Sequence, residues 1–191
     1  LGVSQIEVEG NALVSDAQVR ALSDVTEGQP LARVDIDAVA ERVATLSAVR
    51  EVDVSRKWPN SLLVRVQERT VVAVMQVGTT FRGVDASGVV FRRYRQAPLR
   101  VPLIRADGEL TAEVRVEGAS VAGSLPAQVA RHVEYVELRT VDDIVLRLRD
   151  GRRVLWGSAQ NTQDKAAVLP LLLKEKGTLY DVTVPGSPTV R

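Results

Sequence analysis

Hydrophobic and polar residues alternate in two adjoining stretches of the sequence VSRKWPNSLLVRV, residues 54–66. A period of two is typical of a β-strand with one buried face, because successive side chains point to opposite sides of a sheet. The two stretches are separated by Trp58-Pro59-Asn60, a combination that favours a turn. The pattern therefore predicts a hairpin, in which Val52, Val54, Arg56 and Trp58 share one face of the first strand and Leu62, Val64 and Val66 share one face of the second.

A strand and two helices are predicted before this hairpin. Residues 5–9 alternate in the same way and stop at a Gly-Asn turn. Ser15 followed three residues later by Gln18 is a capping box, which indicates that a helix begins there. After Asp35, a good N-cap residue, apolar side chains recur at helical spacing at Ile36, Val39, Ala40, Val43 and Leu46. Residues 1–69 are thus predicted to form a β-α-α-β-β unit, in which the apolar stripe of the second helix covers a sheet.

Residues 70–191 have a different pattern, in which short alternating runs predominate. Strands are predicted over Thr70–Val77, on both sides of the turn Asp85-Ala86-Ser87-Gly88, and over Val133–Leu138, Ile144–Leu148, Arg153–Trp156 and Tyr180–Val184. Helices are predicted over Thr111–Leu125 and Lys165–Lys176. The fold class is therefore α+β, with residues 1–69 followed by a mostly antiparallel β domain with flanking helices. No Gly/Ser spacer separates the two at residues 68–70, which favours a stiff junction.

Composition and charge exclude several classes of protein. Lys and Arg number 25 against 24 Asp and Glu, so no overall electric field favours nucleic acid. Cys is absent, which excludes disulfides, Cys-ligated zinc and thiol nucleophiles. No run of apolar residues approaches the ~20 that a membrane-spanning helix requires.

Catalytic candidates are few, and each has a simpler interpretation. His132 is the single histidine, so a metal site or a triad has little to be built from. Gly118–Ala122 resembles a nucleophile elbow but ends in Ala where that motif has Gly. Asp142-Asp143 is more typical of a solvated turn than of a cation site. A small hydrolase is therefore disfavoured, and no catalytic residue, cofactor, metal or small-molecule substrate is predicted.

Three other side chains have a structural and a functional interpretation. Trp58 either packs against the helix pair or is an exposed docking aromatic, and the sequence leaves both open. Arg56 is expected at the rim of the apolar face of its strand, with its charge reaching solvent. Trp156 is expected in the core of the second domain.

The ordered set of motifs resembles one protein family. IEVEGNALVSDAQVRAL, residues 6–22, is similar to the opening of a polypeptide-transport-associated (POTRA) domain. VREVDVSRKWPNSLLVRVQERTVVAV, residues 49–74, resembles the closing hairpin of this domain in the FtsQ/DivIB cell-division proteins, although Ser61, Val64 and Val71 replace the usual Thr, Ile and Pro. FRGVDASGVVF, LRLRDGRRVLWGS and YDVTVPGSPTV are similar to segments of that family's second, β domain.

The resemblance implies a function in which the protein binds other proteins and catalyses no reaction. It predicts the extracytoplasmic part of a single-pass membrane protein, a divisome scaffold at the division septum of the bacterial cell membrane. Because the chain begins at Leu1 and not at Met, a membrane-spanning helix is expected shortly before it. The alternative is a POTRA module of a polypeptide-translocating outer-membrane barrel system, which several POTRA repeats would favour; the sequence has one such unit.

The resemblance also implies where partners bind. In FtsQ-like proteins the last strand and the helix before it receive extracytoplasmic segments of FtsB- and FtsL/DivIC-type proteins, while the POTRA half contacts other divisome membrane proteins. A final strand at a sheet edge has free backbone groups that can pair with another chain. The predicted partner-binding residues are Val182, Thr183, Val184, Gly186 and Ser187, with Lys165, Leu169 and Leu172 on the neighbouring helix.

Overall fold

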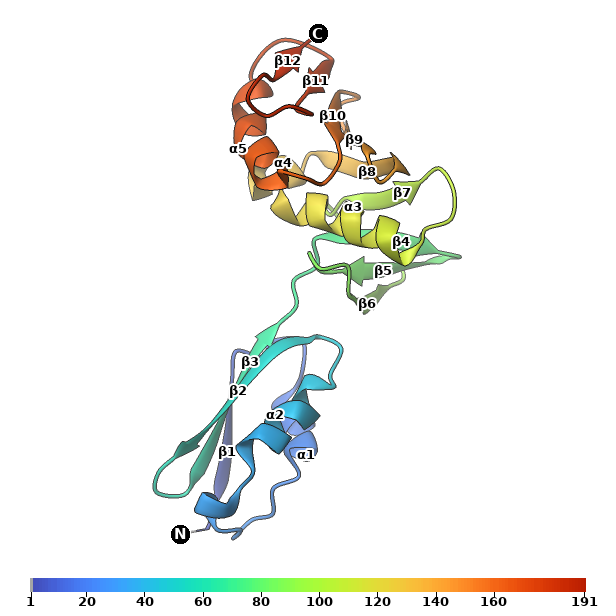
Figure 1. The fold of residues 1–191 in the computed structure, drawn as a ribbon. Helices are drawn as coiled ribbons and strands as arrows, with labels where there is room; N and C mark the ends of the chain where they lie inside the picture. The colour runs from blue at the N-terminus through green and yellow to red at the C-terminus, as the bar shows by residue number, and fades with distance from the viewer. Residues whose placement is uncertain (1) are drawn as a thin grey trace. The chain divides into compact units, whose positions relative to one another are not determined.

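The computed structural model describes residues 2–191, which form two compact units: the first ends at Arg69 and the second is Thr70–Arg191 (Figure 1). The first unit has the predicted order β-α-α-β-β, with one additional short 3₁₀ helix, η1, between its two helices. Its elements are β1 (Gln5–Glu9), α1 (Asp16–Ser23), η1 (Leu31–Arg33), α2 (Ile36–Ala44), β2 (Val49–Lys57) and β3 (Ser61–Glu68). In the three-stranded sheet β3 lies in the centre, parallel to β1 and antiparallel to β2.

Local sequence signals explain both helices of this unit. The Ser15 side chain accepts a hydrogen bond from the backbone N–H of Gln18, and the Gln18 side chain accepts one from the backbone N–H of Ser15, so the capping box is confirmed. Asp35 caps α2 through the N–H of Ala38. Both helices lie on the same side of the sheet, as Figure 1 shows. They bury their apolar stripes against it and form a core with Val19, Val39, Val43, Leu62 and Val64.

The second unit is built around a nine-stranded sheet in which antiparallel pairs predominate, as predicted. Its strands are β4 (Ala73–Val77), β5 (Thr80–Val84), β6 (Val90–Tyr94), β7 (Leu103–Ala106), β8 (Val133–Thr140), β9 (Asp143–Leu148), β10 (Arg153–Gly157), β11 (Leu179–Asp181) and β12 (Thr189–Val190). Its helices are α3 (Ala112–Ser124), α4 (Ala127–Ala130) and α5 (Thr162–Leu172). The strand order is β12-β11-β10-β9-β8-β7-β4-β5-β6, so β12 and β6 are the two edge strands of the described sheet.

Helix α3 packs on β4, β7 and β8 and lies beside α5. The sequence predicts this helix although Val114, Val116 and Gly118 suit it poorly, and the contacts of Gly118 give the reason. A Cβ atom at this position would lie 3.0 Å from Ile104 and 3.1 Å from Leu138. The glycine therefore lets α3 approach the sheet closely.

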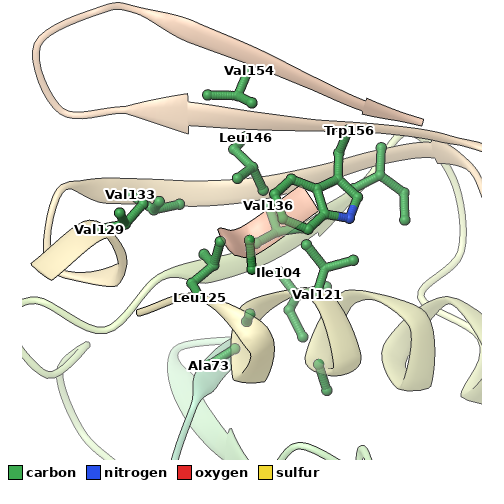
Figure 2. Packing of buried hydrophobic residues seen from close by; sticks show 14 of the residues in the cluster. Ala73, Ile104, Val121, Leu125, Val129, Val133, Val136, Leu146, Val154 and Trp156 are labelled. Carbon is green, nitrogen blue, oxygen red and sulfur yellow. The ribbon is translucent and has the colours of Figure 1, made fainter. Parts of the chain in front are cut away.

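Trp156 lies in the core of the second unit, as predicted (Figure 2). Its side chain is fully buried and extends from β10 toward α3, on the same face of the sheet as Val136 and Leu146. Its indole Nε1 donates a hydrogen bond of 3.1 Å to Thr162 Oγ1 in the first turn of α5. This one residue links the sheet to the helix that precedes the candidate partner site.

The predicted strand over Tyr180–Val184 is wrong in its extent. Strand β11 ends at Asp181, because the Asp181 carboxylate accepts hydrogen bonds from both the backbone N–H and the hydroxyl of Thr183 and turns the chain. A second turn follows, in which the N–H of Ser187 donates to Val184 O at 3.0 Å. The chain then returns as β12, antiparallel to β11.

A candidate partner-binding edge in the second unit

Strand β12 has unpaired backbone groups on its outer side. Its inner side pairs with β11, and beyond its end Leu179 and Arg191 exchange two backbone hydrogen bonds of 3.0 and 2.9 Å. In an antiparallel pair the next residue along the strand directs its N–H and C=O the opposite way. Val190 stands opposite Tyr180 at that position, so its N–H and C=O point away from β11. No strand of the described chain covers this edge, and it can accept a strand from another molecule.

Four of the predicted partner-binding residues lie in the exposed loop between β11 and β12. They are Thr183, Val184, Gly186 and Ser187. Val184 is 61% exposed and offers an apolar side chain at the surface of this loop. An added Cβ at Gly186 would meet no atom within 4 Å, so this position is open to an approaching chain. The structure therefore places these four residues together at one end of the free edge.

Val182 is not available at this surface. Its side chain is fully buried in the core, and its N–H donates to Leu155 O of β10 at 3.0 Å. The alternation along the predicted strand put Val182 and Val184 on one face. The turn at Asp181 breaks this alternation, so the two valines lie in different environments.

The candidates on α5 also face the interior. Lys165 and Leu169 are buried, and Leu172 is partly buried against the same core. The Lys165 ammonium donates to Ser158 O at 2.8 Å, and burial lowers the pKa of this lysine. The large apolar residue that α5 exposes is Leu171, at 67%. These three predicted residues therefore support α5 from inside and do not present themselves to a partner.

Replacing Lys165 with methionine is expected to remove a pH dependence of stability. Burial lowers the folded-state pKa of Lys165 below 10.5, the value of an ordinary lysine. Between the two pKa values the unfolded chain binds more protons than the folded one, so the free energy of unfolding rises with pH in that interval. Below the folded-state pKa both states hold the proton and the full cost of burying the charge is present.

This prediction is tested by urea unfolding at neutral pH and just below pH 10.5. The wild-type chain should gain stability between the two conditions relative to Lys165→Met. Lys174→Met is the matched control, because it makes the same chemical change at an exposed position. If Lys165→Met and Lys174→Met behaved alike, Lys165 would not be the titrating group.

A cluster around Tyr180 holds the edge in place, and the sequence pattern did not predict it. Arg152 Nη1 donates to the Tyr180 hydroxyl and to Leu173 O, both at 3.1 Å. The hydroxyl lies 2.9 Å from the carbonyl oxygens of both Glu175 and Gly177 and donates to one of them. The hydrogen bond to Tyr180 and the neighbouring Asp150 raise the pKa of Arg152, against the effect of burial. The available signal was a tyrosine two residues before Val182, on the same predicted strand face, because a buried tyrosine hydroxyl usually finds a hydrogen-bond partner.

Matches to known families cover both units. Residues 1–69 match the model of the POTRA domain, FtsQ-type, and residues 73–184 match that of the Cell division protein FtsQ/DivIB, C-terminal. The chain belongs to the FtsQ/DivIB family of cell-division proteins. Members of this family are membrane-associated, act in division at the septum and are generally non-catalytic.

Curated FtsQ/DivIB relatives align with the whole chain. A "Cell division protein FtsQ" of Streptomyces bingchenggensis is 36% identical over 201 residues, which span 100% of this chain and 76% of that protein. The protein of the same name from Mycolicibacterium smegmatis is 38% identical over 192 residues, 100% of this chain and 57% of its own length. The structure of the major extracytoplasmic domain of DivIB from Geobacillus stearothermophilus aligns with a TM-score of 0.46 and 19% identity, over 55% of this chain and 91% of that one.

The catalytic candidates of this FtsQ/DivIB chain do not assemble into a site. His132 is exposed and its Nε2 accepts from Arg131 Nε at 3.3 Å, while Gly118–Ala122 lies inside α3 and not at a strand-to-helix turn. Asp142 is exposed in the turn before β9. Among residues 2–191 no three His, Asp or Glu side chains are grouped so as to hold a metal ion. None of the helices in this part of the chain is both long and apolar enough to span a bilayer.

Proposed function

We propose that this chain is a non-enzymatic divisome scaffold, the extracytoplasmic region of a single-pass membrane protein that binds FtsB- and FtsL/DivIC-type partners. The observation that carries the proposal is the free edge of β12, where the backbone groups of Val190 point outward. Membership of the FtsQ/DivIB family supports the role in division.

The mode of binding is strand addition. A partner segment in extended conformation pairs with Val190 and extends the nine-stranded sheet by one strand. Thr183, Val184, Gly186 and Ser187 then lie beside one end of the added strand, where the exposed Val184 offers apolar contact. The strand β12 has two residues, so backbone pairing alone is short and side-chain contacts at the loop must supply part of the affinity.

The two halves have separate tasks in this proposal. The β half, residues 70–191, holds the FtsB- and FtsL/DivIC-type proteins, and the POTRA half, residues 1–69, contacts other divisome membrane proteins. The alternative, a module of a polypeptide-translocating system, is disfavoured because residues 73–184 match the C-terminal domain of cell-division proteins.

A reporter that is active only outside the cytoplasm tests the topology when fused after Arg191 of the full-length protein. We expect activity, because a single span before residue 1 places the whole chain on the extracytoplasmic side. The matched fusion carries a reporter that is active only in the cytoplasm and should be silent. Activity of the cytoplasmic reporter would contradict the proposal.

A further inference from the structure

Trp58 is one of two tryptophans. Its side chain is exposed and belongs to neither hydrophobic core. It lies at the tip of the β2–β3 hairpin with 61% of its surface exposed, whereas Trp156 is buried. The structure thus decides between the two interpretations of the sequence in favour of an exposed aromatic. Large aromatic side chains with a polar N–H favour surfaces where one end is apolar and the other wet, such as a protein interface or the headgroup layer of a membrane.

The hairpin tip lies beside the beginning of the described chain. The N–H of Ser4 donates to Asn60 O at 2.8 Å, and β1 starts where Gln5 pairs with Ser61. Because β1 and β3 are parallel, β3 leads away from this end and reaches Glu68 at the opposite end of the sheet. In Figure 1 the tip and the start of β1 lie at the same end of the first unit.

Polar contacts hold the base of the tip in place. Arg56 was expected to reach solvent at the rim, but it is partly buried and donates to the carbonyl oxygens of Leu31 at 3.0 Å and Val34 at 2.6 Å. It thereby ties β2 to η1, whose Arg33 side chain is exposed. Lys57 pairs with Glu7 of β1 at 2.7 Å. These contacts hold the hairpin that carries Trp58, and the exposed Arg33 adds a positive charge to η1.

We infer that the β2–β3 tip contacts the bilayer to which the protein is anchored, with Trp58 in the headgroup region and Arg33 toward lipid phosphates. The inference rests on the proposed span shortly before residue 1, which would hold this end of the POTRA unit near the surface. Tryptophan is enriched at membrane–water interfaces, and cations near a membrane surface favour anionic lipids. One tryptophan binds too weakly to recruit a free protein, so the contact depends on the anchor, which raises the local concentration of the tip. It would orient the POTRA unit on the membrane.

The test uses the 191-residue chain with a histidine tag before Leu1, bound to vesicles of phosphatidylcholine and phosphatidylglycerol that contain a nickel-chelating lipid. The difference in fluorescence between wild type and Trp58→Ser isolates the emission of Trp58 from that of buried Trp156. On tethering, we expect the Trp58 emission to shift to shorter wavelength and to be quenched by lipids brominated near the headgroup. Untethered chain mixed with the same vesicles without the chelating lipid should show neither effect.

A matched control carries Trp58→Ser together with Leu13→Trp. Leu13 is 42% exposed, and its N–H donates to the carboxylate of Glu68 at the opposite end of the same sheet, so this tryptophan should remain in water when the chain is tethered. Equal quenching at both positions, or no quenching of Trp58, would overturn the inference. The exposed tip would then be interpreted as a binding site for a protein partner. The tether replaces the natural anchor, so this outcome does not depend on whether the proposed topology and partners are correct.

Discussion

Replacing Trp156 with alanine is expected to lower the free energy of unfolding of the second unit by about 3–5 kcal/mol, the usual cost of truncating a large buried aromatic residue. The indole is fully buried between β10 and α3. Its loss leaves a cavity and also removes the 3.1 Å hydrogen bond to Thr162 at the start of α5. Urea unfolding followed by far-UV circular dichroism measures the effect, with the transitions of the two units fitted separately.

Trp58→Ala is the matched control because it makes the same chemical change at an exposed position. We expect it to change the free energy of unfolding by less than about 0.5 kcal/mol, as is usual for surface substitutions. Similar losses in the two variants would mean that Trp156 is not the centre of the core, or that Trp58 is packed in solution.

The first unit could be predicted from the sequence nearly completely, because its signals are local. The capping box at Ser15 and the cap at Asp35 fix where the helices begin. The alternation around Trp58-Pro59-Asn60 defines the hairpin, and helix periodicity shows which faces meet the sheet. Among the helices and strands described in this unit, only η1 was missed, since three residues are too few to establish a period.

The order of the strands in the second unit could not be predicted in this way. Strand β7 lies between β4 and β8, parallel to both, and this pairing joins segments far apart in the sequence. Periodicity shows which residues of a strand face the core but not which strand is its neighbour. The end of β11 depends on the Asp181 side chain, whose hydrogen bonds to Thr183 are a local choice that alternation does not reveal.

The location of the candidate site within the chain remains a prediction, and the structure shows which of its predicted residues are exposed and which are buried. The exposed loop holds Thr183, Val184, Gly186 and Ser187, whose role in partner binding remains a prediction. The error on α5 has a physical reason: residues 166–173 are almost uniformly apolar, so the sequence has no polar stripe to distinguish the inner face from the outer one. The burial of Lys165 could not be predicted either, because lysine is usually exposed.

Replacing Val190 with proline is expected to weaken partner binding at least about tenfold. Proline removes the outward N–H, and its ring occupies the space that an added strand must enter. One lost hydrogen bond, worth about 0.5–1.5 kcal/mol, weakens binding by about two- to tenfold, and the steric clash of the proline ring with the added strand raises the loss further. The inner bonds between β11 and β12 do not use this N–H, so the unit should remain folded.

Val190→Ala is the matched control for this substitution. The Val190 side chain is partly buried against the core, and alanine removes that packing while it keeps the backbone donor. Val190→Pro and Val190→Ala should therefore lose similar packing and differ mainly in the outward N–H. Circular dichroism of both variants verifies that the second unit remains folded before binding is compared.

The measurement that tests the scaffold proposal most directly is a calorimetric titration of the chain with a peptide from the extracytoplasmic segment of an FtsB-type partner. Wild type and Val190→Ala should bind with similar affinity, and Val190→Pro should bind at least about tenfold more weakly, because a strand added at β12 needs the Val190 donor. Equal affinity of Val190→Pro and Val190→Ala, with both variants folded, would contradict partner binding at the β12 edge.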